Sequence, residues 1–245
     1  MIKYEFPLNE RIRRLIRLEE LFSKTTSALT STHKFSTYIA FERLFELMQT
    51  ASRSDLKVDL MQEAERQKIK IKAKSRTKVN SQMLIKLTKL KTSLEKAKIH
   101  PGYYFGDDKF LQEIKSRNDS PYGITSVDFP EFQYWLHSES IQFQKDYLSK
   151  KLQPYNPIKD AISTLMGILR TSVETQSVTA ESGVYQRKLD PALKFDLVTL
   201  IISKSMNCFP NISSNKYAIS IHFNHAKKKV QLEKDIRFKL GLASL

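Results

Sequence analysis

Hydrophobic residues in the first half of the chain recur every three or four positions, which is the spacing of one face of an α-helix. The first such run starts after Pro7 and continues through Ile12 to Phe22. Residues 35–51 are apolar around most of a helical circumference, so we expect that helix to be buried on two sides. Ser54 is expected to cap a third helix.

A fourth helical run has the spacing of a coiled-coil seam, because its apolar residues follow a 4-3-4-3 pattern. Two heptads are too few to be stable alone, so the seam needs a partner, either in this chain or in a second copy. We expect Ser81 to cap this helix, and Asp107 and Asp108 to start a short helix near residues 107–115, where their charge favours the helix dipole. The seam consists of Met83, Leu87, Leu90, Leu94 and Ala97.

The pattern changes after the turn that Pro121, Tyr122 and Gly123 predict. The aromatic-rich residues 124–137 predict one or two strands, and a helix returns over about 139–151. Another helix is predicted up to about residue 171, beginning where Asn156 can cap it and Pro157 can take its first position.

Beyond residue 175, apolar and polar residues alternate, as they do in antiparallel sheets with one face in water. The alternation runs through residues 193–198, 217–223 and 236–240. The predicted fold class is therefore α+β, with a helical and a β-rich domain. We assign residues 8–120 and 138–173 to the helical domain, and residues 1–7, 121–137 and 174–245 to the β-rich domain.

Composition is typical of a folded, soluble protein: the 245 residues are 40% hydrophobic and 10% aromatic. Cys208 is the single cysteine, so no internal disulfide can form, which fits a reducing compartment. The N-terminus lacks the apolar stretch of a signal peptide, and no run of 18 apolar residues exists. We expect a cytoplasmic protein with no membrane partner.

Glycine and histidine usage argues against common kinds of enzyme site. None of the six glycines lies closer than four residues to another, which excludes both the dinucleotide-binding turn and the Walker phosphate loop. His222 and His225 form a close pair without a neighbouring cysteine, and we interpret them as surface residues rather than metal ligands. We expect no enzyme activity, no cofactor and no metal.

Most of the excess positive charge lies in residues 66–98, which hold 12 Lys or Arg and one acid, Glu95. The chain as a whole carries a net charge of +15. Such a field attracts acidic partners and is screened by salt, although keeping a helical hairpin soluble would also explain it. A nucleic-acid-binding protein is the alternative function that this charge suggests. The window contains no Phe, Tyr or Trp on which bases could stack, so nucleic acid is not the favoured partner.

Four blocks of sequence carry more information than composition does. They read YEFPLNERIR at residues 4–13 (with Leu15 and Arg17), VDFP through YWLH within 127–137, GVYQ at 183–186 and FPNIS at 209–213. In order and spacing along the whole chain, these blocks resemble the ZapD family, the Z-ring-associated cell division proteins of proteobacteria.

The resemblance implies a homodimer in which each chain has a helical domain and a β-sandwich-like domain. It also implies an adaptor that binds the C-terminal tail of the tubulin-like protein FtsZ in a basic pocket between the domains. Two such pockets in a dimer would cross-link FtsZ filaments into bundles and promote assembly of the Z-ring at midcell. An FtsZ-binding adaptor is therefore the favoured function, a nucleic-acid-binding protein the second, and an enzyme the third.

The resemblance also implies binding residues for the FtsZ tail. Arg13 and Arg17 match arginines of the first helix, and Arg53 matches a basic residue after the second. Lys109 stands where the family has an arginine before an apolar residue. On the strand after the FPNIS block, Ala218 and His222 stand where members can have arginine, and Lys216 is expected to compensate. The expected site is thus Arg13, Arg17, Arg53, Lys109, Lys216 and His222.

Overall fold

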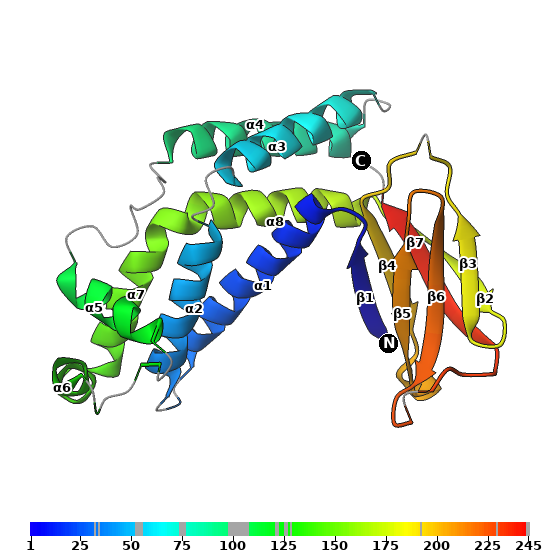
Figure 1. The fold of residues 1–245 in the computed structure, drawn as a ribbon. Coiled ribbons are helices and arrows are strands. Elements are labelled where there is room, and N and C mark those ends of the chain that lie inside the picture. Colours follow the sequence, from blue (N-terminus) through cyan, green and yellow to red (C-terminus); the bar gives the residue numbers. More distant parts are fainter. Residues whose placement is uncertain are drawn as a thin grey trace. The chain divides into compact units, whose positions relative to one another are not determined.

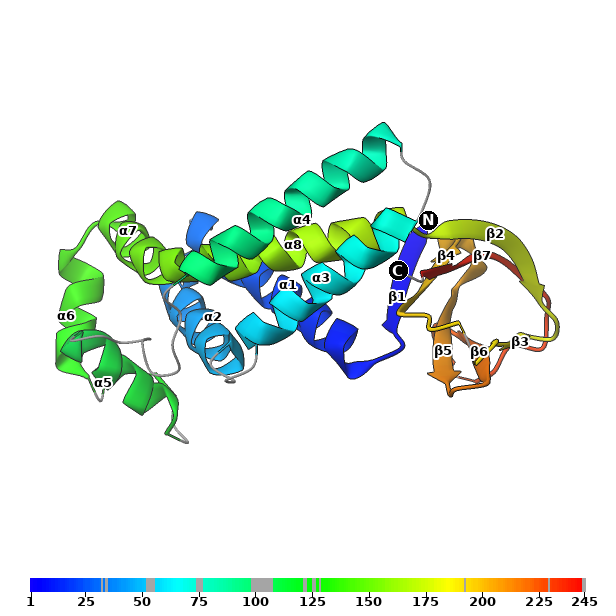
Figure 2. The same cartoon turned by 90° about the horizontal axis from the view of Figure 1, so that it is seen from above.

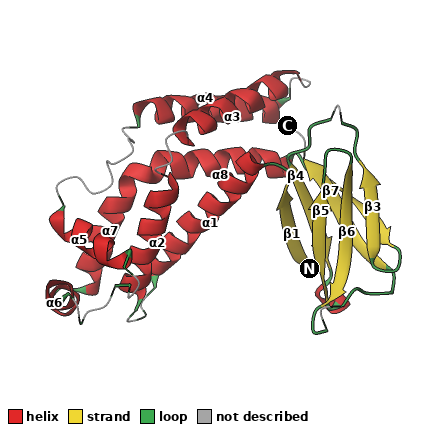
Figure 3. Cartoon of the chain, in the orientation of Figure 1, coloured by secondary structure: helices red, strands yellow, loops and turns green. Residues whose placement is uncertain are grey.

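In a computed structural model of the protein, strands occupy the two ends of the chain and helices occupy its middle (Figures 1 and 3). This confirms the predicted α+β fold class. The elements group into two units, one of residues 1–15 and 166–245 and one of residues 16–165. The structure describes residues 1–31, 33, 35–51, 56–73, 77–97, 108–120, 123–124, 127, 129–191, 193–228 and 230–243.

The strands of the first unit form two antiparallel sheets, a four-stranded sheet of order β1-β4-β7-β2 and a three-stranded sheet of order β3-β6-β5. One hydrophobic core is shared by both sheets, so together they form a sandwich (Figure 2). The strands are β1 (Ile2–Pro7), β2 (Glu174–Ala180), β3 (Val184–Lys188), β4 (Leu197–Ile202), β5 (Cys208–Ser214), β6 (Ala218–His225) and β7 (Ile236–Ala243), and a short 3-10 turn spans Lys204–Met206.

Two of the three predicted alternations are confirmed, and the third is shifted. Ile219, Ile221 and Phe223 of β6 are fully buried, and so are the alternate apolar residues of β7. By contrast, β4 begins only at Leu197, and the predicted strand residue Leu193 is 54% exposed. β4 lies between β1 and β7 and is buried along nearly its whole length, so it has no wet face to produce alternation.

An ion pair joins the N-terminal strand to the end of a helix within this unit. The Arg170 Nε and Nη2 atoms donate hydrogen bonds of 2.8 to 3.1 Å to both carboxylate oxygens of Glu5 on β1. Lys3 approaches the same carboxylate to 2.6 Å. Burial opposes ionisation of Glu5, but these two cations outweigh it and hold the pKa of Glu5 below its ordinary value of 4.5.

The turn that follows β1 is fixed by Asn9. Its Oδ1 accepts a hydrogen bond of 3.0 Å from the backbone N–H of Ile12, which caps the first helix. Its Nδ2 donates a bond of 3.0 Å to the buried carboxylate of Asp196, just before β4. The β1 turn therefore determines where α1 starts.

The helices begin with α1 (Glu10–Thr30) and α2 (Ser36–Ala51), and both were predicted. α1 and α8 each contribute residues to both units, while the other helices belong to residues 16–165. The remaining elements are α3 (Leu56–Ala73), α4 (Lys78–Lys96), α5 (Lys109–Asn118), α6 (Pro130–Ser138), α7 (Ile141–Leu152), a 3-10 turn (Gln153–Tyr155) and α8 (Asn156–Thr171).

The prediction of strands over residues 124–137 is wrong, because α6 occupies residues 130–138 and belongs to the helical unit. The assignment of 121–137 to the β-rich domain depended on those strands. Aromatic residues favour strands in general, but Phe132 and Trp135 are three positions apart and share one face of α6. They pack against Phe41 of α2, at ring-centroid distances of 5.5 and 5.9 Å.

The coiled-coil seam finds its partner within the chain. Leu87, Leu90 and Leu94 of α4 are buried, and α4 forms an antiparallel hairpin with α3. Two contacts give the register: Lys57 Nζ donates to the Ala97 carbonyl at 3.0 Å, and Lys91 lies 3.6 Å from Glu65. The seam thus gives no evidence for a second copy.

Several predicted helix starts can be compared with the observed caps. Ser81 is not the cap of α4: Thr77 is, because its side chain accepts a hydrogen bond of 3.1 Å from the N–H of Asn80. Asp108 does cap α5, as predicted, through a bond of 2.9 Å from the N–H of Leu111. Ser54, Asp107 and Pro121-Tyr122 lie outside the described residues.

We expect replacement of Glu5 by Gln to lower stability by about 1–2 kcal/mol near neutral pH, since it removes a bidentate, charge-assisted contact. A carboxyl with a depressed pKa stabilises the folded state above its unfolded pKa and loses this effect as the pH falls through the folded pKa. The difference between wild type and Glu5→Gln should therefore be full above about pH 5 and shrink in more acidic solution. Urea unfolding at a series of pH values measures it, and a difference that is independent of pH would contradict the assignment.

Candidate partner-binding site

Helix α1 presents Arg13 and Arg17 to solvent, one turn apart. Ile12, Leu15 and Leu18 of the same helix are buried, so the arginines project from the opposite side. Their side chains are 53% and 65% exposed. This is the pair on the first helix that the sequence resemblance singled out.

The contacts of the two arginines are weak enough to leave them available to a ligand. Arg13 Nε lies 3.2 Å from Glu10 Oε1, and its guanidinium carbon is 6.0 Å from the Phe6 ring centre. Arg17 lies 3.7 Å from Glu46, a carboxylate that Arg43 also contacts at 2.5 Å. Exposed ion pairs of this kind contribute at most about 1 kcal/mol, so an incoming carboxylate can replace them.

Only one of the two carboxylates that pair with these arginines could be predicted from the sequence. Glu10 stands three residues before Arg13 on one helix, so its approach follows from helical spacing alone. Glu46 comes from α2, and no local spacing links it to Arg17. Sequence reasoning missed it for that reason.

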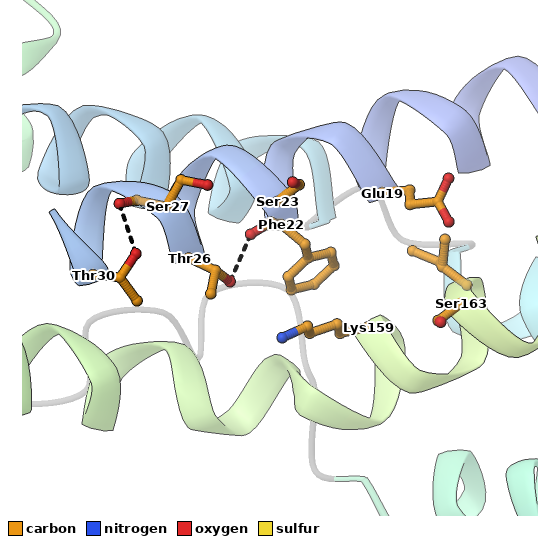
Figure 4. A pocket seen from close by; sticks show the side chains of 9 residues that line it. Glu19, Phe22, Ser23, Thr26, Ser27, Thr30, Lys159 and Ser163 are labelled. Carbon is orange, nitrogen blue, oxygen red and sulfur yellow. Dashed lines mark hydrogen bonds between the residues drawn. The ribbon is translucent and has the colours of Figure 1, made fainter. Parts of the chain in front are cut away.

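A cavity of about 330 Å³ lies in the helical unit between α1 and α8 (Figure 4). Phe22 and Ile162 give it an apolar wall, and one carboxylate, Glu19, and one ammonium group, Lys159, line it. Hydroxyl groups supply the rest of the polar lining. They belong to Ser23, Thr26, Ser27, Thr30 and Ser163, and those of Thr26 and Thr30 donate to carbonyls of their own helix. Equal numbers of opposite charges make this cavity unlike the expected basic pocket.

A second cavity of the helical unit, of about 240 Å³, adjoins the counter-ion of Arg17. Arg43 and Lys115 line it together with three carboxylates, those of Glu42, Glu46 and Asp119. Acidic groups thus outnumber basic ones, and this cavity also differs from a basic pocket. Neither cavity brings the predicted cations together.

The other predicted site residues lie on separate elements. Lys109 is the first residue of α5 and is exposed, and Arg53 lies outside the described residues. Lys216 is exposed in the turn between β5 and β6, with its ammonium 5.7 Å from the centre of the Tyr217 ring. His222 lies in the middle of β6, on the face of the sheet opposite the core residues Ile221 and Phe223. Within their unit, Lys216 and His222 are six residues apart along the chain and are not neighbours.

The two close histidines do not form a metal site. His222 and His225 are three residues apart on β6, so their side chains project from opposite faces of the sheet. His222 Nε2 lies 3.0 Å from Ser220 Oγ, and His225 Nδ1 accepts a bond of 3.2 Å from the backbone N–H of Lys227. No cluster of three metal-binding side chains occurs among the described residues.

A partly buried carboxylate at the start of α5, that of Asp108, could resemble an active-site group, but its contacts show a structural role. Asp108 accepts hydrogen bonds from Tyr147 Oη at 2.8 Å and pairs with Lys151 at 2.5 Å, besides capping α5. Burial opposes ionisation of Asp108, but these donors outweigh it and lower its pKa. Burial and the adjacent Asp108 raise the pKa of Tyr147. An ionised carboxylate and a neutral phenol at neutral pH make a stable link between α5 and α7, with no group poised to transfer a proton.

No helix in the described part of the chain combines the length and apolarity needed to cross a bilayer.

Comparison with known proteins gives one consistent result. The family described as ZapD, cell division protein, matches residues 16–222. The chain is 34% identical over 253 residues to the cell division protein ZapD of Aromatoleum aromaticum, covering 100% of this chain and 98% of the relative. It is 33% identical to the ZapD protein of an Azoarcus species and 34% identical to that of Nitrosomonas eutropha, with 100% of both chains covered in each case.

We expect Asp108→Ala to destabilise the protein by about 2–3 kcal/mol, because it removes a helix cap and leaves Tyr147 and Lys151 without their partly buried partner. Asp119→Ala is the matched control, because Asp119 lies at the other end of α5 with its side chain 57% exposed. We expect the control to cost less than about 1 kcal/mol in urea unfolding. Equal losses in the two variants would contradict the structural role of Asp108.

Proposed function

Because the chain belongs to the ZapD family of cell division proteins, we propose that it is an adaptor that binds the C-terminal tail of FtsZ. As a homodimer it cross-links FtsZ filaments into bundles and promotes assembly of the Z-ring. Its place is the cytoplasm, at the midcell division ring. The adaptor acts by binding alone, without catalysis.

The observation that carries this proposal is the exposed arginine pair on α1. Arg13 and Arg17 lie one turn apart, about 6 Å along the helix, so two guanidinium groups can engage neighbouring acceptors of one extended peptide. An arginine fork forms directed, bidentate bonds to carboxylates, which an ammonium group does not. A peptide tail with carboxylates is therefore the ligand that suits this face best.

A flexible tail loses conformational entropy when it binds, so a single site is expected to bind weakly. Two sites in one dimer make the second contact intramolecular and raise the overall avidity. Weak single sites with high avidity suit the bundling of polymers, where each filament displays many tails. The proposal therefore requires both the binding site and the dimer.

We predict that Arg13→Glu combined with Arg17→Glu abolishes binding of the FtsZ tail peptide. Reversed charges repel an anionic ligand, whereas solvent-facing substitutions cost little stability. Isothermal titration with the synthetic tail peptide measures the binding, and circular dichroism confirms the fold. Undiminished affinity would place the tail site elsewhere.

Lys24→Glu is the matched control for that experiment. Lys24 lies on α1 about 10 Å beyond Arg17, and it pairs with Glu20 at 2.7 Å, much as Arg13 pairs with Glu10. Its reversal creates the same kind of like-charge pair on the same helix. We expect tail affinity to change less than about twofold in this variant.

We predict that the protein is a homodimer assembled through its helical part. Phe35, just before α2, and Ile39 in its first turn are 50% and 44% exposed, and Ile141 and Phe143 of α7 are also exposed. Light scattering on a size-exclusion column should give about twice 28.5 kDa. A monomer at concentrations of about tens of micromolar would exclude cross-linking by this route.

A further inference from the structure

The basic window of the sequence becomes a defined surface in the structure, the α3–α4 hairpin. Across the two described helices, ten Lys or Arg face four Asp or Glu. The acidic residues lie toward the base of the hairpin, and none occurs between Lys68 and Glu95. The half of the hairpin near its tip is therefore uniformly basic.

Lys91 of α4 reaches Glu65 of α3, and the other lysines of α4 lie away from that contact. Leu87, Leu90 and Leu94 are buried against α3, and helical spacing places Lys78 and Lys89 on the opposite side, where they are exposed. Lys86 is also exposed, between those two sides. Because this face has lysines and no arginine, it carries positive charge but no guanidinium group that could form directed, bidentate hydrogen bonds.

Two isoleucines lie among these lysines and are exposed. Ile69 of α3 is 61% exposed and Ile85 of α4 is 56% exposed, and each lies opposite the buried stripe of its own helix. In the hairpin register set by Lys57–Ala97 and Glu65–Lys91, residue 69 of α3 stands level with residues 85–87 of α4. Two large exposed apolar side chains thus lie at one level along the hairpin, among its lysines.

The exposed lysines together with the exposed isoleucines favour one kind of anionic partner over others. A second copy of this hairpin would place lysines against lysines, and their repulsion would oppose the contact. Nucleic acid would use aromatic rings or arginines, but the described hairpin has no aromatic residue, and its one arginine, Arg66, is held by Glu63 at 2.7 and 2.8 Å. The surface of an anionic lipid bilayer carries negative charge spread over its headgroups, with an apolar interior beneath them. Exposed aliphatic side chains enter the headgroup boundary while lysines reach the phosphates.

We propose that the α3–α4 hairpin binds the surface of an anionic lipid bilayer, with Ile69 and Ile85 entering the interface and Lys78, Lys86 and Lys89 contacting headgroups. The contact is peripheral and reversible. It departs from the expectation of no membrane partner, which was based on the lack of a segment that could span a bilayer. It is also independent of the FtsZ tail site, which uses α1.

The test is co-sedimentation of the full chain with vesicles of phosphatidylglycerol and phosphatidylcholine, beside vesicles of phosphatidylcholine alone. We expect binding to the anionic vesicles only, and release by salt at about 0.5 M, where the screening length is short. Ile69→Ser combined with Ile85→Ser should weaken binding about tenfold. Val58→Ser is the control, because Val58 is 51% exposed on the same side of α3 but about 16 Å from Ile69. It should bind within about twofold of wild type.

Charge is tested with Lys86→Gln combined with Lys89→Gln, which should weaken vesicle binding at least about tenfold. Lys227→Gln combined with Lys228→Gln removes the same charge from an exposed turn after β6 and should have little effect. Absence of vesicle binding, or full binding by the Ile69/Ile85 variant, would overturn the proposal. So would DNA binding that the Lys86/Lys89 variant loses while vesicles are not bound. All of these variants should bind the FtsZ tail peptide as wild type does, which separates a failure here from a failure of the proposed function.

Discussion

The bidentate pair between Glu5 and Arg170 is the contact on which the arrangement of the first unit depends. It joins the edge strand β1 to the last turn of α8, two segments 165 residues apart in sequence. Once β1 is held, Asn9 follows at a fixed position, and its side chain both caps α1 and bonds Asp196. The start of α1 determines where Arg13 points. The position of a candidate binding residue therefore follows from an ion pair that makes no contact with the ligand.

The blocks of sequence that identify the family largely have structural roles. In the first block, Glu5 and Asn9 form the contacts just described. In the second, Trp135 lies in an aromatic cluster, 5.4 Å from Phe110 and 5.6 Å from Tyr147. In the third, Gly183 has a φ of +75°, and a Cβ atom there would lie 2.0 Å from the Leu232 carbonyl oxygen, so only glycine fits. A resemblance carried by such residues predicts the fold securely, whereas the proposed binding residues depend on single positions of α1.

The spacing of apolar residues predicted the elements that bury a single face. It failed for elements that are buried on both faces or that pack against partners far away in the sequence. The helices α1, α7 and α8 and the strands β6 and β7 each bury one stripe or face, and their patterns show it. The helix α2 was expected to be buried on two sides, but it buries one broad face and leaves Ile39 exposed. β4 is buried on both faces, so it has no alternation. α6 was predicted as strand because its aromatic residues look like a strand when the partners on α2 and α5 are unknown. The pairing of Glu46 with Arg17, and of α4 with α3, likewise depends on long-range contacts that spacing cannot supply.

The chain carries two kinds of positive charge, and their chemistry separates two kinds of recognition. At the proposed tail site on α1 the cations are arginines beside compensating carboxylates, so the local field is small and bond geometry would decide which ligand binds. In the described part of the α3–α4 hairpin, the cations between Lys68 and Glu95 are lysines and no acid lies among them, so the field is large and undirected. The first arrangement suits a particular group on a peptide, and the second suits a surface of spread charge. Net charge alone would assign both to one acidic partner, whereas the residue types and the exposed isoleucines assign them to different ones.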